Sequence, residues 1–216
     1  MTFNGFPDEA FAFFEGLEAD NSKTYWTKNK ATYEAAVRDP MLALLDELRE
    51  EFGEGHVFRP YRDVRFSKDK SPYKDHQGAF VQLADGMGNY VQVSADGLLV
   101  AGGFHDHASD QVERYRAAVA DDFTGRQLAD ITDAVVAAGF DLGGDRLKTR
   151  PRGIAEDHPR LELLRHRSLT AERSYPPEPW VSTPKALDAV REGWRALGPL
   201  NQWLFRHVGP TRQPRR

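Results

Sequence analysis

Apolar residues recur at steps of three and four along the first fifty residues, and this spacing predicts three helices. The first begins near Phe6 and Pro7 and ends at about residue 19; a second follows the polar turn "DNSKT"; a third begins at Pro40 and ends at Gly53. The side chains expected on their buried faces are Ala10, Phe14, Leu17, Trp26, Tyr33, Val37, Met41, Leu44, Leu45, Leu48 and Phe52.

The apolar pattern changes to a period of two after residue 58, which is typical of strands with one buried face. Strand-like alternation covers residues 63–66, 80–83 and 90–94, and "LLVAGGF" adds a further strand. "ADGMGN" and "ADG" are strong turn signals between them. The pattern predicts an antiparallel meander of about four or more strands. Its expected inner face consists of Val64, Val81, Leu83, Val91 and Val93.

Helical spacing returns in the second half of the chain. Helices are predicted from Ser109, from near Thr124 to Gly139, within "PRLELLRHRSL", and after Ser182 or Thr183. "YPPEPW" cannot form a regular helix, and "GP" at 198–199 should break the last helix. With no repeat and no long linker, we predict a single α+β domain over residues 1–208, in which the meander packs against N-terminal and C-terminal helices. Residues 209–216 should form a flexible basic tail.

Composition narrows the classes of function. The chain has no cysteine, no apolar run long enough for a membrane span and no signal-peptide pattern at its start, so we expect a cytoplasmic protein without membrane contact. Its formal net charge of −4 disfavours a general nucleic-acid binder.

One segment departs from this acidic balance. The stretch "FRPYRDVRFSKDKSPYKDH" at residues 58–76 holds six Lys or Arg residues against three Asp, with aromatic residues between them. Cations alternating with hydroxyl groups in a turn are suited to binding an anion. The residues expected to bind it are Arg62, Arg65, Ser67, Lys68, Lys70 and Lys74. Asp63 would orient an arginine.

Two further groups of residues are expected near this anion. The outer face of the meander should present Gln82, Tyr90 and Gln92 as a polar floor, and Asn21, Lys23 and Asn29 would approach from the helices. The hypothesis is a basic cleft for a phosphate- or carboxylate-bearing small molecule. The alternatives are an Arg65–Asp63 pair beside solvated lysines, or a buried ion-pair network that fixes the fold and binds nothing.

A second basic cluster lies at Arg146, Lys148, Arg150 and Arg152, followed by "GIAEDHPR". Arg152 could bind the same anion, and His158 could act as a general acid or base there. Under this alternative the protein is an enzyme with His158 or Asp63 as its catalytic group. The alternative interpretation gives these residues no function in binding: Asp157 caps a helix and His158 is structural.

The remaining motifs indicate no cofactor. "HDH" at 105–107 has no partner motif, so no metal site is predicted, and neither a dinucleotide fingerprint nor a phosphate-binding loop is present in the sequence. Nucleic-acid or protein binding through the two basic clusters is a third hypothesis. The apolar stripe along residues 194–204 favours a core helix, with a self-association face, and hence a homodimer, as its alternative.

Four segments together resemble a known family. They are "GFPDEAFAFFEGLEADNSKTYWTKNKATYEAAVRDPM", "FRPYRDVRFSKDKSPYK", "YVQVSADGLLVAGG" and "LKTRPRGIAEDHPRLELLRHRSL". In this order they are similar to a family of bacterial and fungal conserved hypothetical proteins, domain of unknown function twenty-four sixty-one. The resemblance covers roughly residues 3–170 and implies no particular activity.

Overall fold

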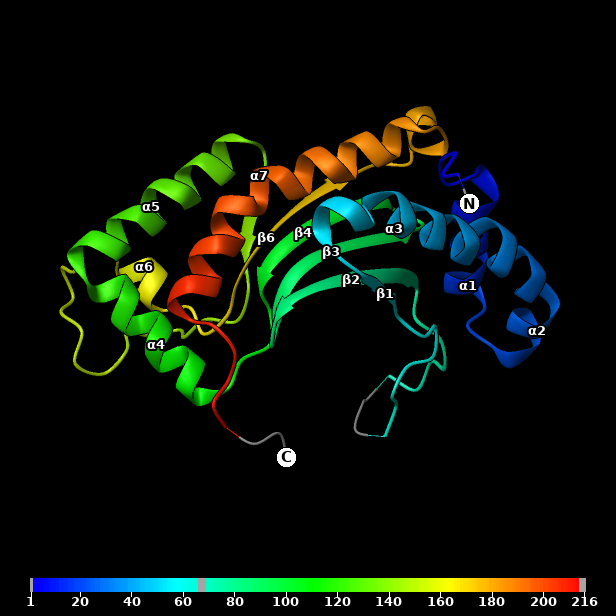
Figure 1. The fold of residues 1–216 in the computed structure, drawn as a ribbon. Helices are drawn as coiled ribbons and strands as arrows, with labels where there is room; N and C mark the ends of the chain where they lie inside the picture. Colours follow the sequence, from blue (N-terminus) through cyan, green and yellow to red (C-terminus); the bar gives the residue numbers. More distant parts are fainter. Residues whose placement is uncertain (1, 66–68, 214–216) are drawn as a thin grey trace. The chain divides into compact units, whose positions relative to one another are not determined.

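Helices flank an antiparallel sheet in the computed structural model, which describes residues 2–65 and 69–213 (Figure 1). The helices are α1 (Asp8–Ala19), α2 (Lys23–Thr32), the π-helix η1 (Tyr33–Arg38), α3 (Asp39–Phe52), α4 (Ser109–Ala120), α5 (Asp122–Ala137), α6 (Leu161–Leu164), the 3-10 helix η2 (Pro179–Ser182) and α7 (Lys185–His207). The strands are β1 (Gly55–Val57), β2 (His76–Ala84), β3 (Met87–Ser94), β4 (Gly97–Phe104), β5 (Asp141–Gly143) and β6 (Leu169–Tyr175). The predicted α+β class is confirmed.

The six strands have the spatial order β1-β2-β3-β4-β6-β5. Two-residue turns join β2 to β3 and β3 to β4, which confirms the predicted meander. Gly86 in the first turn has a φ of 73°, and a Cβ at this position would lie 1.9 Å from the Asp106 carbonyl oxygen, so the turn requires glycine. β1 pairs antiparallel with β2, and β5 with β6. The apolar pattern of the sequence does not predict β1, β5 and β6, because these strands are short or carry charged residues.

The chain divides into two compact units, and each is described by itself. The first unit comprises Met1–Val81, Tyr90–Val100 and Ser174–Glu192, and the second comprises Gln82–Asn89, Ala101–Arg173 and Gly193–Arg216. Strands β2, β3, β4 and β6 and helix α7 each continue from one unit into the other.

In the first unit, α1, α2, η1 and α3 follow one another and pack together. Trp26, Tyr33 and Val37 are buried, as their spacing predicts. Gly53 ends α3 with a φ of 96°, a left-handed conformation that favours glycine. No break separates η1 from α3, so Pro40 lies in the first turn of α3 within a continuous run of helix.

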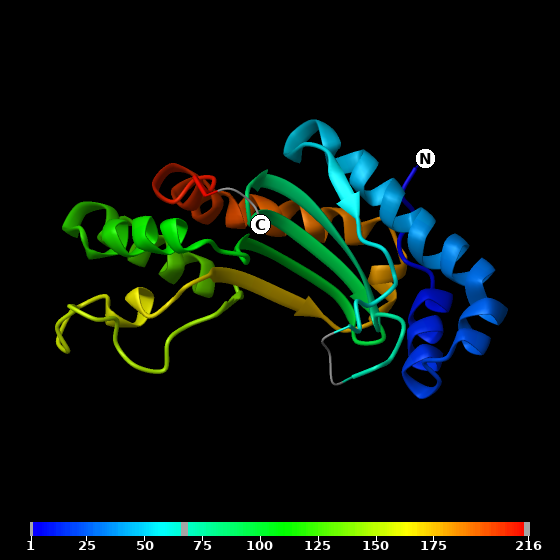
Figure 2. The ribbon, with the colours of Figure 1, turned by 90° about the horizontal axis from the view of Figure 1, so that it is seen from below.

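In the second unit, α4 and α5 lie side by side (Figures 1 and 2), and their apolar faces join those of α6, β6 and the end of α7 in one core. The core contains Met87, Phe104, Tyr115, Val119, Leu128, Val135, Leu164, Leu169, Leu197, Leu200, Trp203 and Leu204 among others. The segment between β5 and α6 is irregular (Figure 2). No helix in the described part of the chain has both the length and the apolar character that a bilayer span requires.

The prediction that Gly198 and Pro199 end the last helix, α7, is wrong. The helix continues through Pro199 to His207. A proline inside a helix costs about 3 kcal/mol. Burial of each large apolar side chain contributes roughly 1.5–3 kcal/mol, and Leu197, Leu200 and Leu204 on both sides of the proline are fully buried. Packing therefore outweighs the local penalty.

The strand predicted at residues 63–66 is wrong for its described part, because residues 58–65 and 69–75 are largely irregular (Figure 2). Only Tyr61 and Tyr73 form an isolated antiparallel bridge within the described part of this segment. Asp63 accepts a hydrogen bond from the backbone N–H of Arg65, and Asp69 accepts one from that of Ser71. Such local side-chain to backbone bonds compete with the hydrogen bonds of a sheet.

The predicted inner face of the sheet holds for three of its five members. Val81, Val91 and Val93 are fully buried, whereas Leu83 is 41% exposed. The alternation of buried and exposed residues in β2 is interrupted after Val81, because Gln82 and Leu83 are both exposed and Ala84 is buried again. Val64 is half-buried within the irregular segment.

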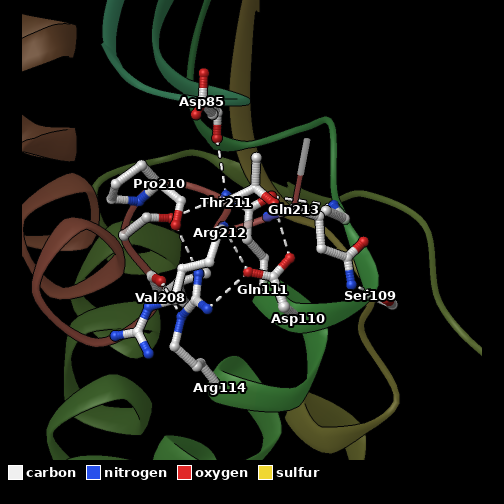
Figure 3. A network of polar contacts seen from close by, with 12 residues as sticks. Asp85, Ser109, Asp110, Gln111, Arg114, Val208, Pro210, Thr211, Arg212 and Gln213 are labelled. Atoms are coloured by element: carbon white, nitrogen blue, oxygen red, sulfur yellow. Dashed lines mark hydrogen bonds and ion pairs between the residues drawn. The ribbon is translucent and has the colours of Figure 1, made fainter. Parts of the chain in front are cut away.

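Residues 209–213, expected to be a flexible tail, lie along the start of α4 (Figure 3). Asp110 accepts hydrogen bonds from the Thr211 hydroxyl and the Arg212 backbone N–H, both at 2.8 Å. Arg114 donates to the carbonyl oxygens of Val208 and Pro210. These bonds hold the described part of the tail against the second unit.

Candidate functional site

A cleft of about 670 Å³ lies in the first unit between α2, η1 and the segment that follows β1. Small-molecule sites in proteins commonly have volumes of about 300–1,000 Å³. The residues that line it are Trp26, Lys30, Tyr33, Glu34, Arg38, His56, Val57, Phe58, Arg59, Pro60, Tyr61 and Lys74. We call it the α2–η1 cleft.

Helical spacing brings the first wall of the cleft together. The Ser22 side chain caps α2 by accepting a hydrogen bond from the Tyr25 N–H at 3.1 Å. Trp26, Lys30 and Tyr33 then follow at steps of four and three, which places them on one face. The π-helical turn of η1 ends with Arg38, which also lines the cleft. Turns of this kind are rare and occur frequently at functional sites.

Aromatic rings form the floor of the cleft. The Trp26 ring stacks on Tyr73, with centroids 4.3 Å apart and an interplanar angle of 8°. The centroids of Tyr33 and Tyr61 lie 4.8 and 5.9 Å from that of Trp26. Trp26 and Tyr33 are buried, whereas Tyr61 is 50% exposed. Tyr61 therefore presents much of its ring outward.

A buried amide, Gln77, joins the two walls. Its Oε1 accepts a hydrogen bond from the Tyr33 hydroxyl at 2.5 Å, and its Nε2 donates to the carbonyl oxygens of Phe58 and Gly78 at 2.7 and 2.9 Å. Burial raises the pKa of Tyr33 to about 12, so its phenol is neutral at physiological pH. Gln77 thereby fixes Tyr33 on η1 and Phe58 on the opposite wall.

The charge of the lining is strongly biased. Four of the lining side chains are Lys or Arg and one, Glu34, is a carboxylate. Glu34 pairs with Lys30 at 3.6 Å on the exposed surface of the helix. Within residues 2–65 and 69–213, Arg38 and Arg59 make no ion pair. The Asp63 carboxyl, whose pKa is lowered mainly by hydrogen bonds from Arg65, also interacts with the charge of Arg59. The positive charge of the cleft is therefore compensated only in part.

Lys74 extends over the wall formed by Phe58. Its Nζ lies 5.1 Å from the centroid of the Phe58 ring, a cation–π contact. Burial lowers the pKa of Lys74, and the positive charge of Arg59 lowers it further. Both effects disfavour the charged ammonium, and attraction to a bound anion would oppose them by favouring the charged form.

The structure separates the cations that the sequence groups together in residues 58–76. Arg62 forms an ion pair with Asp69, and Arg65 forms one with Asp63 at 2.6 Å. Lys70 donates to the Val64 carbonyl oxygen at 2.9 Å. These side chains are engaged locally and are not part of the cleft lining. Ser67 and Lys68 lie outside the described residues.

Asp63 holds Arg65 through several hydrogen bonds, including one from Arg65 Nε at 2.9 Å. The hydrogen bonds from the Arg65 side chain and backbone lower the pKa of the Asp63 carboxyl. A carboxylate with a lowered pKa is a weaker base, so this arrangement does not favour general-base chemistry.

The expected helical and sheet contributors make hydrogen bonds within the protein or are exposed. Asn21 Oδ1 accepts from the Tyr73 N–H and Nδ2 donates to the Tyr73 carbonyl oxygen, both at 3.1 Å, while Asn29 donates to the Tyr25 carbonyl oxygen. Lys23 is exposed at the start of α2. In β3, the Tyr90 hydroxyl donates to Gln92 Oε1 at 2.8 Å, and burial raises the pKa of Tyr90 to about 12.

The residues predicted from the second basic cluster belong to the second unit, as does the exposed Gln82. Arg152 is exposed, and His158 Nδ1 accepts a hydrogen bond from the Arg160 N–H at 3.1 Å. This bond places the proton of a neutral His158 on Nε2. Throughout the part of the chain that the structure describes, no group of three or more His, Asp or Glu residues could hold a metal ion.

Arg160 has a structural role that sequence reasoning missed. Arg160 is only 7% exposed. Its guanidinium donates hydrogen bonds to the carbonyl oxygens of Val119 and Ala120 at the end of α4. It also pairs with Asp122 at 3.0 Å. A buried guanidinium that satisfies helix-terminal carbonyl groups stabilises the junction between α4 and α5.

Sequence reasoning also missed most of the cleft itself. Trp26, Lys30, Tyr33 and Arg38 were not among the predicted site residues, although their spacing along one helical face was visible. The apolar pattern predicts Trp26 and Tyr33 on a buried helical face and indicates no role for Lys30 or Arg38. Gln77 gave no comparable signal, because its role depends on contacts with residues far away in the sequence.

Comparison with known proteins adds a family but no activity. The model of the family described as "Conserved hypothetical protein (DUF2461)" matches residues 9–203. The match includes every residue that lines the cleft. No curated protein matches the chain.

Proposed function

The chain belongs to this family of conserved hypothetical proteins, and we propose that it binds a phosphate- or carboxylate-bearing small molecule in the α2–η1 cleft, in the cytoplasm. One observation carries the proposal: four cationic side chains and one carboxylate line the cleft, and that carboxylate already pairs with Lys30. Three of these cations are exposed and Lys74 is half-buried. A concave surface lined by an excess of positive charge attracts anions from solution.

Arg59 and Lys74 would supply the main contacts. A guanidinium can bind a carboxylate or phosphate through two parallel hydrogen bonds, whereas an ammonium acts as a compact point charge. The charge of Arg59 already disfavours the protonated form of Lys74. An anion between the two groups would therefore interact favourably with both.

Of the expected cations that belong to the described part of the chain, Lys74 alone lines the cleft. The proposed cation set becomes Lys30, Arg38, Arg59 and Lys74. Arg62 and Arg65, each of which already has an aspartate partner, are left out of it. This revision keeps the expected class of ligand and changes the residues that bind it.

Isothermal titration calorimetry with pyrophosphate and citrate tests the proposal. We expect Arg59→Gln to weaken binding by about tenfold or more, since hydrogen bonds to charged groups contribute roughly 1.5–3 kcal/mol. Arg65→Gln is the matched control, because Arg65 is exposed and pairs with Asp63 outside the cleft lining. Its affinity should stay within about twofold of wild type. The proposal would be contradicted if wild type bound neither pyrophosphate nor citrate, or if the two variants lost the same amount of affinity.

A further inference from the structure

We infer that the ligand of the α2–η1 cleft is a planar aromatic ring that bears the anionic group, an aryl phosphate or aryl carboxylate. The inference rests on the proposed function and specifies the class of its ligand. It follows from the ring system beside the cations and from the exposure of Tyr61.

Tyr61 is an exposed ring on an ordered aromatic array. It is 50% exposed, although its ring centroid lies 5.9 Å from that of Trp26 and 5.3 Å from that of Tyr73. Aromatic rings with such spacings attract one another. The ring of a ligand can therefore stack on the exposed part of Tyr61. The outward part of Tyr61 is available for this contact.

The backbone that carries Tyr61 is held in place. Tyr61 forms an isolated antiparallel bridge with Tyr73. On either side, the Arg62 N–H donates to the Pro72 carbonyl oxygen at 2.9 Å and the Lys74 N–H donates to the Pro60 carbonyl oxygen at 2.8 Å. A ring on such a fixed segment loses little conformational entropy when a ligand binds.

The cations lie where the substituent of a stacked ring would reach. Arg59 precedes Tyr61 by two residues, with Pro60 between them, and both side chains line the cleft. The chain bends at Pro60, and the residues on both sides of this bend line the same cleft. A ring on Tyr61 would therefore direct its anionic group toward Arg59.

Two other ligand classes fit the lining less well. A cation held by an aromatic cage would face four like charges against one carboxylate. An aliphatic polyanion would use the cations but leave the open face of Tyr61 unused. An aromatic anion would both pair with the cations and stack on the Tyr61 ring.

A matched pair of probes, phenyl phosphate and methyl phosphate, tests the inference, because they carry the same phosphate monoester and differ in the ring. By calorimetry, wild type should bind phenyl phosphate about tenfold more tightly, since stacking on an aromatic side chain is worth about this much or more. Tyr61→Ala should remove the difference between the probes, and Tyr61→Phe should restore it. Urea unfolding of both variants checks that they remain folded.

The outcomes separate the inference from the proposed function. If wild type binds both probes equally and Arg59→Gln weakens both, the anion site stands and the aromatic ligand class is wrong. If Tyr61→Ala is folded and still prefers phenyl phosphate, the inference is also overturned. If neither probe binds wild type, the proposed function itself fails.

Discussion

Two amide side chains hold the α2–η1 cleft together at the scale of single residues. Gln77 connects Tyr33 to the Phe58 backbone, and Asn21 bonds to both backbone groups of Tyr73. Tyr73 in turn stacks on Trp26. Both amides have donors and acceptors engaged, so their contribution is to position the aromatic rings.

Asn21 offers a direct test of this role. Asn21→Ala removes two hydrogen bonds to the buried Tyr73, so we expect the free energy of unfolding to fall by about 1–3 kcal/mol in urea titrations. Asn29→Ala is the control. Within the described residues, the Asn29 side chain bonds just to the Tyr25 carbonyl oxygen one turn earlier, so its loss should cost less. Stability equal to wild type together with lost anion binding would instead identify Asn21 as a ligand contact.

Tyr33 should make stability depend on alkaline pH. Its pKa is about 12 in the folded chain and 10.0 as the reference value, so the folded state retains a proton that the unfolded state loses. The resulting stabilisation is fully present below about pH 10 and is lost as the pH rises toward about 12. In urea unfolding across this interval, wild type should lose stability more steeply than Tyr33→Phe. Parallel slopes would show that Tyr33 does not contribute.

At the scale of elements, α4 anchors the residues that follow α7. Gln111 Nε2 donates to the carbonyl oxygens of Asp85 and Gly209, at 3.0 and 2.8 Å (Figure 3). The hydrogen bond from the Arg212 N–H is the largest contribution that lowers the pKa of the Asp110 carboxyl. The carboxylate therefore stays ionised well into the acid range and keeps accepting these hydrogen bonds.

Replacing this carboxylate should release the tail. In Asp110→Ala, we expect trypsin to cleave after Arg212 roughly tenfold faster, because proteolysis follows the population of the open form. Mass spectrometry of the product identifies the site of cleavage. Asp133→Ala on the exposed side of α5 is the control and should leave the rate unchanged. Equal rates in wild type and Asp110→Ala would show that Asp110 does not hold the tail.

At the scale of the whole molecule, the sequence predicts the class of fold because its patterns are local. Helical spacing locates α1 to α5, and the turn signals locate the β2–β3–β4 meander. The continuation of α7 through Pro199 is not predictable in this way, because it depends on burial of Leu197, Leu200 and Leu204 in the core of the second unit. Local rules fail where tertiary packing outweighs them.

Among the described residues predicted to bind an anion, Lys74 alone lines the α2–η1 cleft. Composition identifies residues 58–76 as basic, but it does not show that Asp63 and Asp69 already pair with Arg65 and Arg62. The cleft combines residues 26–38 with 56–61 and Lys74, and only the fold brings these segments together. No pattern in a single segment contains that information.

The most direct measurement of the central claim is a crystal structure of the chain with phenyl phosphate. The account predicts phosphate oxygens within hydrogen-bonding distance of the Arg59 guanidinium, with Lys74 Nζ nearby and the phenyl ring stacked on Tyr61. Phosphate bound only beside Arg65, Arg152 or other exposed cations, with the α2–η1 cleft filled by water, would contradict it.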